Sequence, residues 1–128
     1  MHFTIQSLDH LVLTVADVDS SCQFYQRVLG MKLIVFGEGR KALGFGQQKL
    51  NLHTHGAEFE PKAKAPTPGS ADICLITEAP IDTVIAHLAA NQVDVIEGPV
   101  ARTGAIGPIT SVYFRDPDNN LVEVARYD

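Results

Sequence analysis

Apolar residues in the first half of the chain form strand-like runs around one helix-like stretch. Residues 8–15 are mainly β-branched or aliphatic and predict a strand buried on both faces. Residues 18–29 repeat apolar side chains at helical spacing, after Asp17, which can cap a helix, and before Gly30, which can end one. Three more strands are predicted at 31–36, 41–45 and 49–54. The expected order is β-α-β-β-β.

The second half repeats this order after a stretch, 56–70, whose prolines and charged residues are typical of a linker. A helix is expected after Pro80. Strands are expected at 72–77, 93–96, 110–114 and 121–125. The chain therefore consists of one supersecondary unit used twice. We expect a single domain, 1–128, with a first module at about 6–55 and a second at about 71–127.

Composition narrows the functional classes. The 128 residues include 10 Lys or Arg and 15 Asp or Glu, giving a net charge of −5 without any basic run. Nucleic acid is disfavoured as a partner, because phosphate binding needs clustered cations. There is no apolar stretch of membrane-spanning length and no secretory signal pattern at the N-terminus, and the two cysteines are too few for a disulfide framework. We expect a cytoplasmic protein with no membrane partner.

Polar residues interrupt apolar strands at matching points of the two halves. Overlaying the halves places His10 opposite Asp72 and Asn51 opposite Glu123. Because strand side chains alternate between faces, Asn51 and His53 are expected on one face. Burying carboxylates and imidazoles among apolar residues is costly unless they pair or bind a metal ion. This pattern predicts a functional site.

The sequence resembles the vicinal oxygen chelate superfamily, which includes glyoxalase I, fosfomycin- and bleomycin-resistance proteins and extradiol dioxygenases. The resemblance rests on Leu8-Asp9-His10-Leu11-Val12-Leu13, with Phe24-Tyr25 and Leu29-Gly30 downstream, and on Tyr113-Phe114-Arg115-Asp116-Pro117-Asp118 followed by Leu121-Val122-Glu123-Val124. It implies an α+β fold in which tandem βαβββ modules form an open, cupped mixed sheet. It also implies a divalent metal ion, with Ni, Zn, Mn and Fe(II) as candidates.

The resemblance also implies ligands. His10 and Glu123 match two family ligands, Asp72 stands where a third ligand is usually His, and Asn51 stands where glyoxalase I has Glu. His53 would restore a second imidazole. The predicted metal ligands are thus His10, Glu123, Asp72 and His53. The residues themselves leave open a core role for His10, a turn-capping role for Asp72 and a solvent-exposed position for His53.

Asn51, Arg102 and Tyr113 are the candidate substrate-binding residues. Arg102, expected in a loop, would clamp an anion or carboxylate, or would be a solvated loop cation. Tyr113 would line a cavity or pack within the sheet. Asp116 and Asp118 are assigned to a turn.

The expected function is that of a metal-dependent enzyme acting on a small molecule with neighbouring oxygen atoms. Glyoxalase (lactoylglutathione lyase)-like isomerase or lyase chemistry comes first, with Glu123 as the catalytic residue that moves a proton. Extradiol cleavage of catechols by a dioxygenase is the alternative, and a metal-free protein that sequesters an antibiotic is a second one. Family members of this length are usually homodimers, so a second copy of the chain is expected as a partner.

Overall fold

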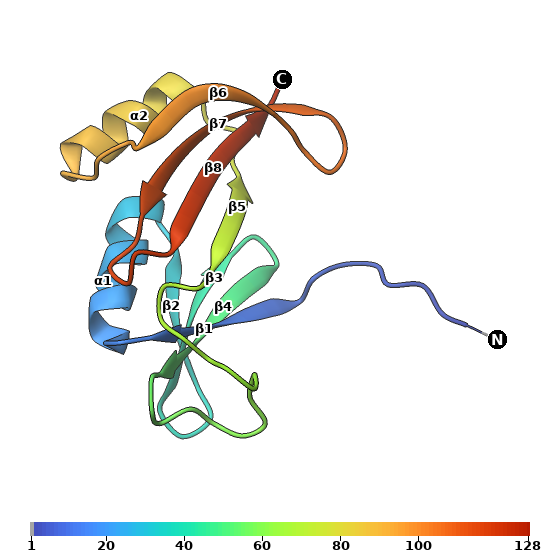
Figure 1. Ribbon diagram of the computed structural model, residues 1–128, viewed down its shortest axis with the longest axis vertical. Helices are drawn as coiled ribbons and strands as arrows, with labels where there is room; N and C mark the ends of the chain where they lie inside the picture. Colours follow the sequence, from blue (N-terminus) through green and yellow to red (C-terminus); the bar gives the residue numbers. More distant parts are fainter. Residues whose placement is uncertain (1) are drawn as a thin grey trace. The chain divides into compact units, whose positions relative to one another are not determined.

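The computed structural model describes residues 2–128 (Figure 1). In chain order its elements are β1 His10–Val15, α1 Val18–Leu29, β2 Lys32–Phe36, β3 Arg40–Phe45, β4 Gln48–Thr54, β5 Asp72–Ile76, α2 Ile81–Ala90, β6 Glu97–Thr103, β7 Pro108–Arg115 and β8 Leu121–Tyr127. The predicted α+β class is confirmed. No helix in this range is long and apolar enough to cross a membrane.

The chain divides into two compact units, one up to Pro66 and one from Thr67 onward. This boundary falls inside the predicted linker, 56–70. Each unit holds one helix and one four-stranded sheet, with strand order β1-β4-β3-β2 in the first and β5-β8-β7-β6 in the second. In each sheet the first and last strands of the unit pair in parallel and the other pairs are antiparallel. The duplicated βαβββ order is therefore confirmed.

Helix α1 begins and ends as its sequence predicts. Asp17 accepts a hydrogen bond from the backbone N–H of Asp19 at 3.0 Å and so caps the N-terminus. Gly30 adopts the left-handed conformation, with φ of 65°, and its N–H donates to the Gln26 carbonyl at 3.1 Å. Cys22 is buried in the core, as expected, on the side of the helix that packs against the sheet.

Each unit has its own apolar core. In the first, α1 contacts β2, β3 and β4, and in the second α2 contacts β7. The buried apolar residues of the first core are Leu13, Val15, Cys22, Phe24, Tyr25, Val28, Met31, Ala42, Leu43, Leu50 and Leu52. Those of the second are Leu88, Ile109, Val112, Phe114, Val122, Val124 and Ala125. Most strand residues in these cores lie on one face of each sheet, which leaves the opposite face for polar side chains.

Strand β1 differs from its prediction at its beginning. It starts at His10 rather than at residue 8, and Leu11 and Val12 are 37% and 42% exposed. The predicted burial on both faces is therefore wrong for this half of the strand. The reason is its place in the sheet, because β1 is an edge strand that pairs with β4 alone.

The strand predicted at 93–96 is also wrong, because this segment is irregular and β6 begins at Glu97. Gly98 and Pro99 both lie inside β6. The β6–β7 register shifts between Glu97 and Val100, and β6 is an edge strand. Proline is tolerated at such bulges and edges because it is not required to donate to the ladder. As a result Arg102 lies on a strand and not in the predicted loop.

The turn between β7 and β8 agrees with the prediction for Asp116 and Asp118. The Asp116 carboxylate accepts from the backbone N–H groups of Asp118 and Asn120, each at 2.9 Å, and from the Asn120 side chain at 2.8 Å. Asn120 Oδ1 in turn accepts from the Ala71 N–H at 2.9 Å. These contacts join the start of β5 to the start of β8.

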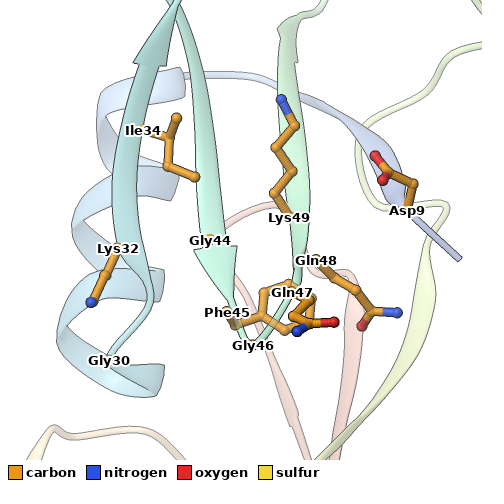
Figure 2. A pocket seen from close by; sticks show the side chains of 10 residues that line it. All are labelled: Asp9, Gly30, Lys32, Ile34, Gly44, Phe45, Gly46, Gln47, Gln48 and Lys49. Atoms are coloured by element: carbon orange, nitrogen blue, oxygen red, sulfur yellow. The ribbon is translucent and has the colours of Figure 1, made fainter.

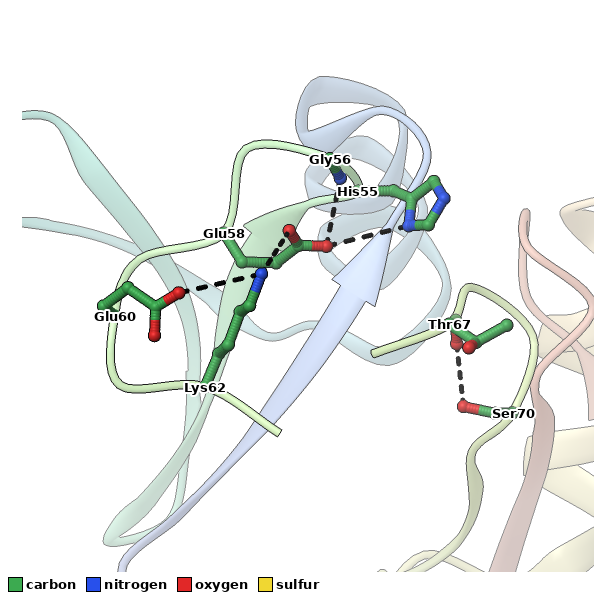
Figure 3. Close-up of polar contacts among 7 residues, drawn as sticks. All are labelled: His55, Gly56, Glu58, Glu60, Lys62, Thr67 and Ser70. Atoms are coloured by element: carbon green, nitrogen blue, oxygen red, sulfur yellow. Dashed lines mark hydrogen bonds and ion pairs between the residues drawn. The ribbon is translucent and has the colours of Figure 1, made fainter. Parts of the chain in front are cut away.

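The loop after β4 is organised by Glu58, whose side chain is 4% exposed (Figure 3). Its carboxylate accepts from the Gly56 N–H at 3.0 Å and lies 3.7 Å from both Lys62 Nζ and His55 Nδ1. Hydrogen bonds from the N–H groups of Glu58 and Gly56 hold the pKa of this carboxyl below its usual range. This part of the predicted linker is thus fixed by its own contacts.

Candidate functional site

The register of the first sheet gathers polar residues on the face opposite its main apolar core. His10 pairs with Lys49, Val12 with Asn51 and Thr14 with His53 across β1 and β4. Since paired residues share a face and faces alternate along a strand, His10, Asn51 and His53 lie on one side of the sheet. We call this side, which also carries Lys32, Ile34 and Phe36 of β2 and Arg40, Ala42 and Gly44 of β3, the open face of the first sheet.

The second sheet has a matching open face. Asp72 pairs with Leu121 and Cys74 with Glu123 across β5 and β8, and Tyr113 of β7 pairs with Glu123 from the other side. Asp72, Cys74, Tyr113 and Glu123 therefore share one side of this sheet. The core residues Val112, Phe114, Val122 and Val124 alternate with them.

The two registers confirm the predicted correspondence between the halves. Asn51 pairs with Val12 of β1, and Glu123 pairs with Cys74 of β5. Two positions before these partners, on the same face, stand His10 and Asp72. Thus Asn51 occupies the place of Glu123 and His10 the place of Asp72 within equivalent sheets.

His10 is held by its sequence neighbour. Its side chain is 43% exposed, and its Nδ1 lies 2.8 Å from the Asp9 carboxylate. A neutral ring that donates through Nδ1 keeps its lone pair on Nε2. A carboxylate–imidazole pair of this kind orients a histidine as a metal ligand.

Asn51 is 6% exposed, and its Oδ1 is buried without a hydrogen-bond partner among residues 2–128. An unsatisfied buried acceptor costs about 1–3 kcal/mol, so it is uncommon unless something else binds it. The amide oxygen can accept from a substrate hydroxyl or bind a cation.

His53 is buried rather than solvent-exposed, at 3% exposure. Arg40 Nη2 approaches its Nε2 at 3.4 Å, and its ring meets Phe59 edge to face at 5.5 Å between centroids. Burial and the Arg40 charge lower the pKa of His53, although Glu58 acts in the opposite direction. The ring is thus neutral at pH 7 and its Nε2 is engaged by a cation, so its predicted role as a metal ligand stays a prediction.

A cavity of about 350 Å³ lies over the open face of the second sheet. Its lining includes Glu123, Cys74, Tyr113 and Arg102. Desolvation and the facing Glu123 carboxylate raise the pKa of the Cys74 thiol to about 11. The thiol is therefore protonated at pH 7 and is not a nucleophile.

Arg102 and Tyr113 are linked to each other beside Glu123. Arg102 Nε donates to the Tyr113 hydroxyl at 3.0 Å, and Arg102 Nη2 donates to Glu97 at 3.0 Å. Desolvation is the main cause that raises the pKa of Tyr113, and Glu123 adds to it. The guanidinium and hydroxyl are thus fixed at the edge of the cavity, where an oxygen-bearing ligand would meet them.

Asp72 is the first residue of β5. The hydrogen bond that joins the start of β5 to the turn between β7 and β8 is made by the Asn120 side chain, which accepts from the Ala71 N–H, and not by Asp72. The capping function considered for Asp72 is therefore performed by Asn120. Asp72 is exposed on the open face, where its carboxylate is available as a ligand.

Two residues of the first open face, Arg40 and Lys49, were missed by sequence reasoning. The period-two pattern Lys49-Asn51-His53 contained the signal, but a lysine near a strand end is ordinarily a solvated residue. Within each unit, the described residues contain no group of three His, Cys, Asp or Glu side chains arranged to hold a metal ion. The metal-ligand assignment therefore stays a prediction.

Comparison with known proteins agrees with this arrangement. Residues 7–124 match the family model of the glyoxalase/bleomycin resistance protein/dioxygenase superfamily. The chain is 53% identical to virulence protein STM3117 of Salmonella typhimurium, over 96% of this chain and 85% of that protein. The crystal structure of the Salmonella protein superposes with a TM-score of 0.97 at 52% identity, covering 98% of this chain and all of that one.

Two further relatives carry more descriptive names. Glyoxalase domain-containing protein RDO1 of Mycosarcoma maydis is 55% identical over 97% of this chain and 70% of its own length. Metallothiol transferase FosB of Staphylococcus epidermidis is 28% identical over 94% of this chain and 81% of its own length.

Proposed function

Because the chain belongs to the glyoxalase/bleomycin resistance protein/dioxygenase superfamily, we propose that it is a divalent-metal-dependent enzyme acting on a small molecule with two neighbouring oxygen atoms. The reaction we favour is a glyoxalase-like isomerisation or lyase step. The observation that carries the proposal is the repeated register, which places His10 and Asp72, and Asn51 and Glu123, at equivalent points of two open sheet faces.

The donor set fits a divalent cation. His10 offers an imidazole nitrogen oriented by Asp9, and Asp72 and Glu123 offer carboxylates. Asn51 adds a buried amide oxygen that lacks a donor. Mixed nitrogen and oxygen ligands suit Ni, Zn, Mn and Fe(II). The name of the relative FosB, a metallothiol transferase, also supports a metal.

When bound, such an ion would act as a Lewis acid that polarises the oxygens of the substrate. Glu123 is the residue that would take a proton from the carbon beside a carbonyl and return it to the neighbouring carbon. Tyr113 and Arg102 would orient an oxygen of the substrate beside Glu123, since each holds the other at 3.0 Å. Cys74 stays protonated and only contributes to the wall of the cavity.

Extradiol cleavage has less support. That chemistry uses two imidazoles and one carboxylate on Fe(II). The second imidazole here would be His53, whose Nε2 faces the Arg40 guanidinium. A metal-free binding protein is the other alternative, and the neutral Asn51 in the position equivalent to Glu123 is the feature that favours it.

Metal analysis of protein purified without chelators tests the proposal. We expect about one divalent ion per site in the wild type and a large loss in His10→Ala and Glu123→Ala. His87→Ala, which removes an exposed imidazole from α2, is the matched control and should retain the metal. Equal metal content in His10→Ala, Glu123→Ala and the wild type would refute the ligand assignment.

The metal-loaded protein then separates the two reactions. Turnover of methylglyoxal with glutathione supports the favoured chemistry, whereas oxygen uptake with a catechol supports ring cleavage. His53→Ala adds a second criterion, because only the ring-cleavage assignment requires this imidazole as a ligand. A protein without metal and without turnover would support the binding alternative.

A further inference from the structure

The open face of the first sheet is cationic in a protein whose net charge is −5. It carries Lys32, Lys49 and Arg40, together with two histidines. None of its strand positions, all of which lie among the described residues, is Asp or Glu. A concentration of one charge sign on one face, against the sign of the whole chain, attracts ligands of the opposite sign.

Lys49 and Arg40 converge on the same aromatic ring. Lys49 Nζ lies 3.8 Å from the centroid of the Phe36 ring, and Arg40 Cζ lies 5.0 Å from it. Arg40 also lies 4.5 Å from the Phe59 centroid. The two cations are thus positioned by aromatic contacts, which hold the side chains without neutralising their charge.

Neither cation forms an ion pair with a carboxylate within the described residues. By contrast, Lys41 pairs with Asp19 at 2.9 Å, and Arg102 pairs with Glu97 at 3.0 Å. Arg40 Nε is moreover buried without a hydrogen-bond acceptor among residues 2–128. An N–H group that lacks an acceptor is costly, and the charges of Lys49 and Arg40 are both left without a carboxylate partner.

Space for the rest of such a ligand lies beside Lys49. A hollow of about 610 Å³ lies there, and Figure 2 shows the side chains of Lys32 and Lys49, two of the residues that line it, on either side of Gly44. Gly44 has no side chain to fill this space, and Ile34 extends over it. The one carboxylate in the lining, that of Asp9, is held by His10.

We propose that Lys49 and Arg40 bind the oxyanion of a small acid, a carboxylate, phosphonate or phosphate, whose neutral part lies in the hollow over Gly44. The inference rests on the proposed function, since it gives the chemical class of the small molecule on which the enzyme would act. It assigns recognition to side chains outside the metal-ligand set, so it is testable without any metal.

The test is a titration of the chelator-treated, full-length protein at low salt, followed by proton–nitrogen NMR that includes the Arg40 Nε–H resonance. Inorganic phosphate, methylphosphonate and acetate are the three probes, and they distinguish a tetrahedral from a planar oxyanion. We expect saturable shifts at Arg40 in the wild type, and roughly tenfold weaker binding in Lys49→Gln and Arg40→Gln, as for the loss of one charge-assisted contact; in Arg40→Gln the backbone amides of β3 and β4 report the binding. Higher salt should weaken binding in the wild type.

Lys64→Gln is the matched control, because it removes the same charge from an exposed residue of the same unit outside the sheet. It should bind the probes as the wild type does. Equal affinity of Lys49→Gln and Lys64→Gln, or the absence of any shift at Arg40 with all three probes, would overturn the proposal. Failure of the metal assignment would appear separately, as unchanged metal content in His10→Ala.

Discussion

At the scale of single residues, two residues of β4 show that a buried polar side chain does not always have a hydrogen-bond partner. Asn51 and His53 are both almost fully buried on the open face of the first sheet. His53 is in contact with Arg40 and Phe59, whereas the Asn51 oxygen lacks a donor among residues 2–128. Sites that bind ligands commonly retain such unsatisfied groups at a cost in stability.

This cost gives a prediction for Asn51→Leu. Replacing the unsatisfied amide by an apolar side chain of similar size should raise the free energy of unfolding by about 1 kcal/mol, while weakening metal or substrate binding. Urea unfolding measures the change in stability. Asn120→Leu is the contrasting variant, because the Asn120 side chain bonds Ala71 and Asp116. It should lose about 2–3 kcal/mol. A large loss in Asn51→Leu would mean that the amide is structurally required.

His53 gives a pH-dependent prediction. Burial and Arg40 lower its pKa in the folded state, so the unfolded ring, with a pKa of about 6.5, takes up its proton first as the pH falls. Stability contributed by the neutral ring is therefore present above about pH 6.5 and declines below it. His53→Gln should lose less stability than the wild type between about pH 7.5 and 5.5.

Chemical denaturation at several pH values measures this difference. His87→Gln, in which an exposed histidine is changed, should follow the wild-type profile. If His53→Gln also follows that profile, the folded and unfolded rings have the same pKa and the burial argument is wrong.

The sequence predicted single residues correctly where the alternation of apolar and polar side chains within one strand was enough to define a position. It paired Asn51 with Glu123 and His10 with Asp72, because each position is defined by its apolar neighbours. It missed Arg40, because the guanidinium is positioned by contacts with Phe36 on another strand and with Phe59 in a loop. Such contacts depend on register between strands, which single-strand patterns do not contain.

At the scale of elements, the helices and most strands follow from periodicity, and the main error concerns the position of β6. The strand predicted at 93–96 lies ahead of glycine and proline at 98–99, which are turn-forming residues in most settings. In the structure, β6 contains this glycine and this proline, because β6 is an edge strand and its register shifts at a bulge there. Whether a strand lies at an edge is a property of the sheet, and no local sequence pattern supplies it.

Gly98 should accordingly be intolerant of a side chain. Its φ is +113°, and an added Cβ would lie 2.5 Å from the Ser111 carbonyl oxygen and 2.9 Å from Val112 Cα. Gly98→Ala should therefore lower the free energy of unfolding by about 3 kcal/mol, through both strain and crowding against β7. Thermal or urea unfolding measures the loss.

Gly39→Ala serves as the comparison for this prediction. Gly39 also has a positive φ, of +79°, but no atom lies within 4 Å of its added Cβ. Its loss should be limited to about 1 kcal/mol, from backbone strain alone. Equal losses at the two positions would show that crowding against β7 contributes nothing.

At the scale of the whole molecule, apolar surface near the N-terminus bears on the expected homodimer. Phe3 and Ile5 are 80% and 76% exposed ahead of β1, and Ile106 is 86% exposed in the second unit. Large apolar side chains exposed in this way are common at surfaces that become covered by association. We predict a dimer by light scattering of the full-length chain, and a shift toward monomer in a Phe3→Ser, Ile5→Ser double variant. Thr4→Ser is the control, and a monomeric wild type would contradict the prediction.

The bare α-carbon of Gly44 has a consequence for how this molecule can change. A methyl group there would approach the Ile34 terminal carbon to 2.7 Å and push it into the space beside Lys49. The volume of the hollow therefore depends on the absence of a side chain at Gly44, and a substitution there would change it without a movement of the backbone. Gly44→Ala would thus reduce the space in this hollow while leaving the proposed metal ligands and Lys49 unchanged.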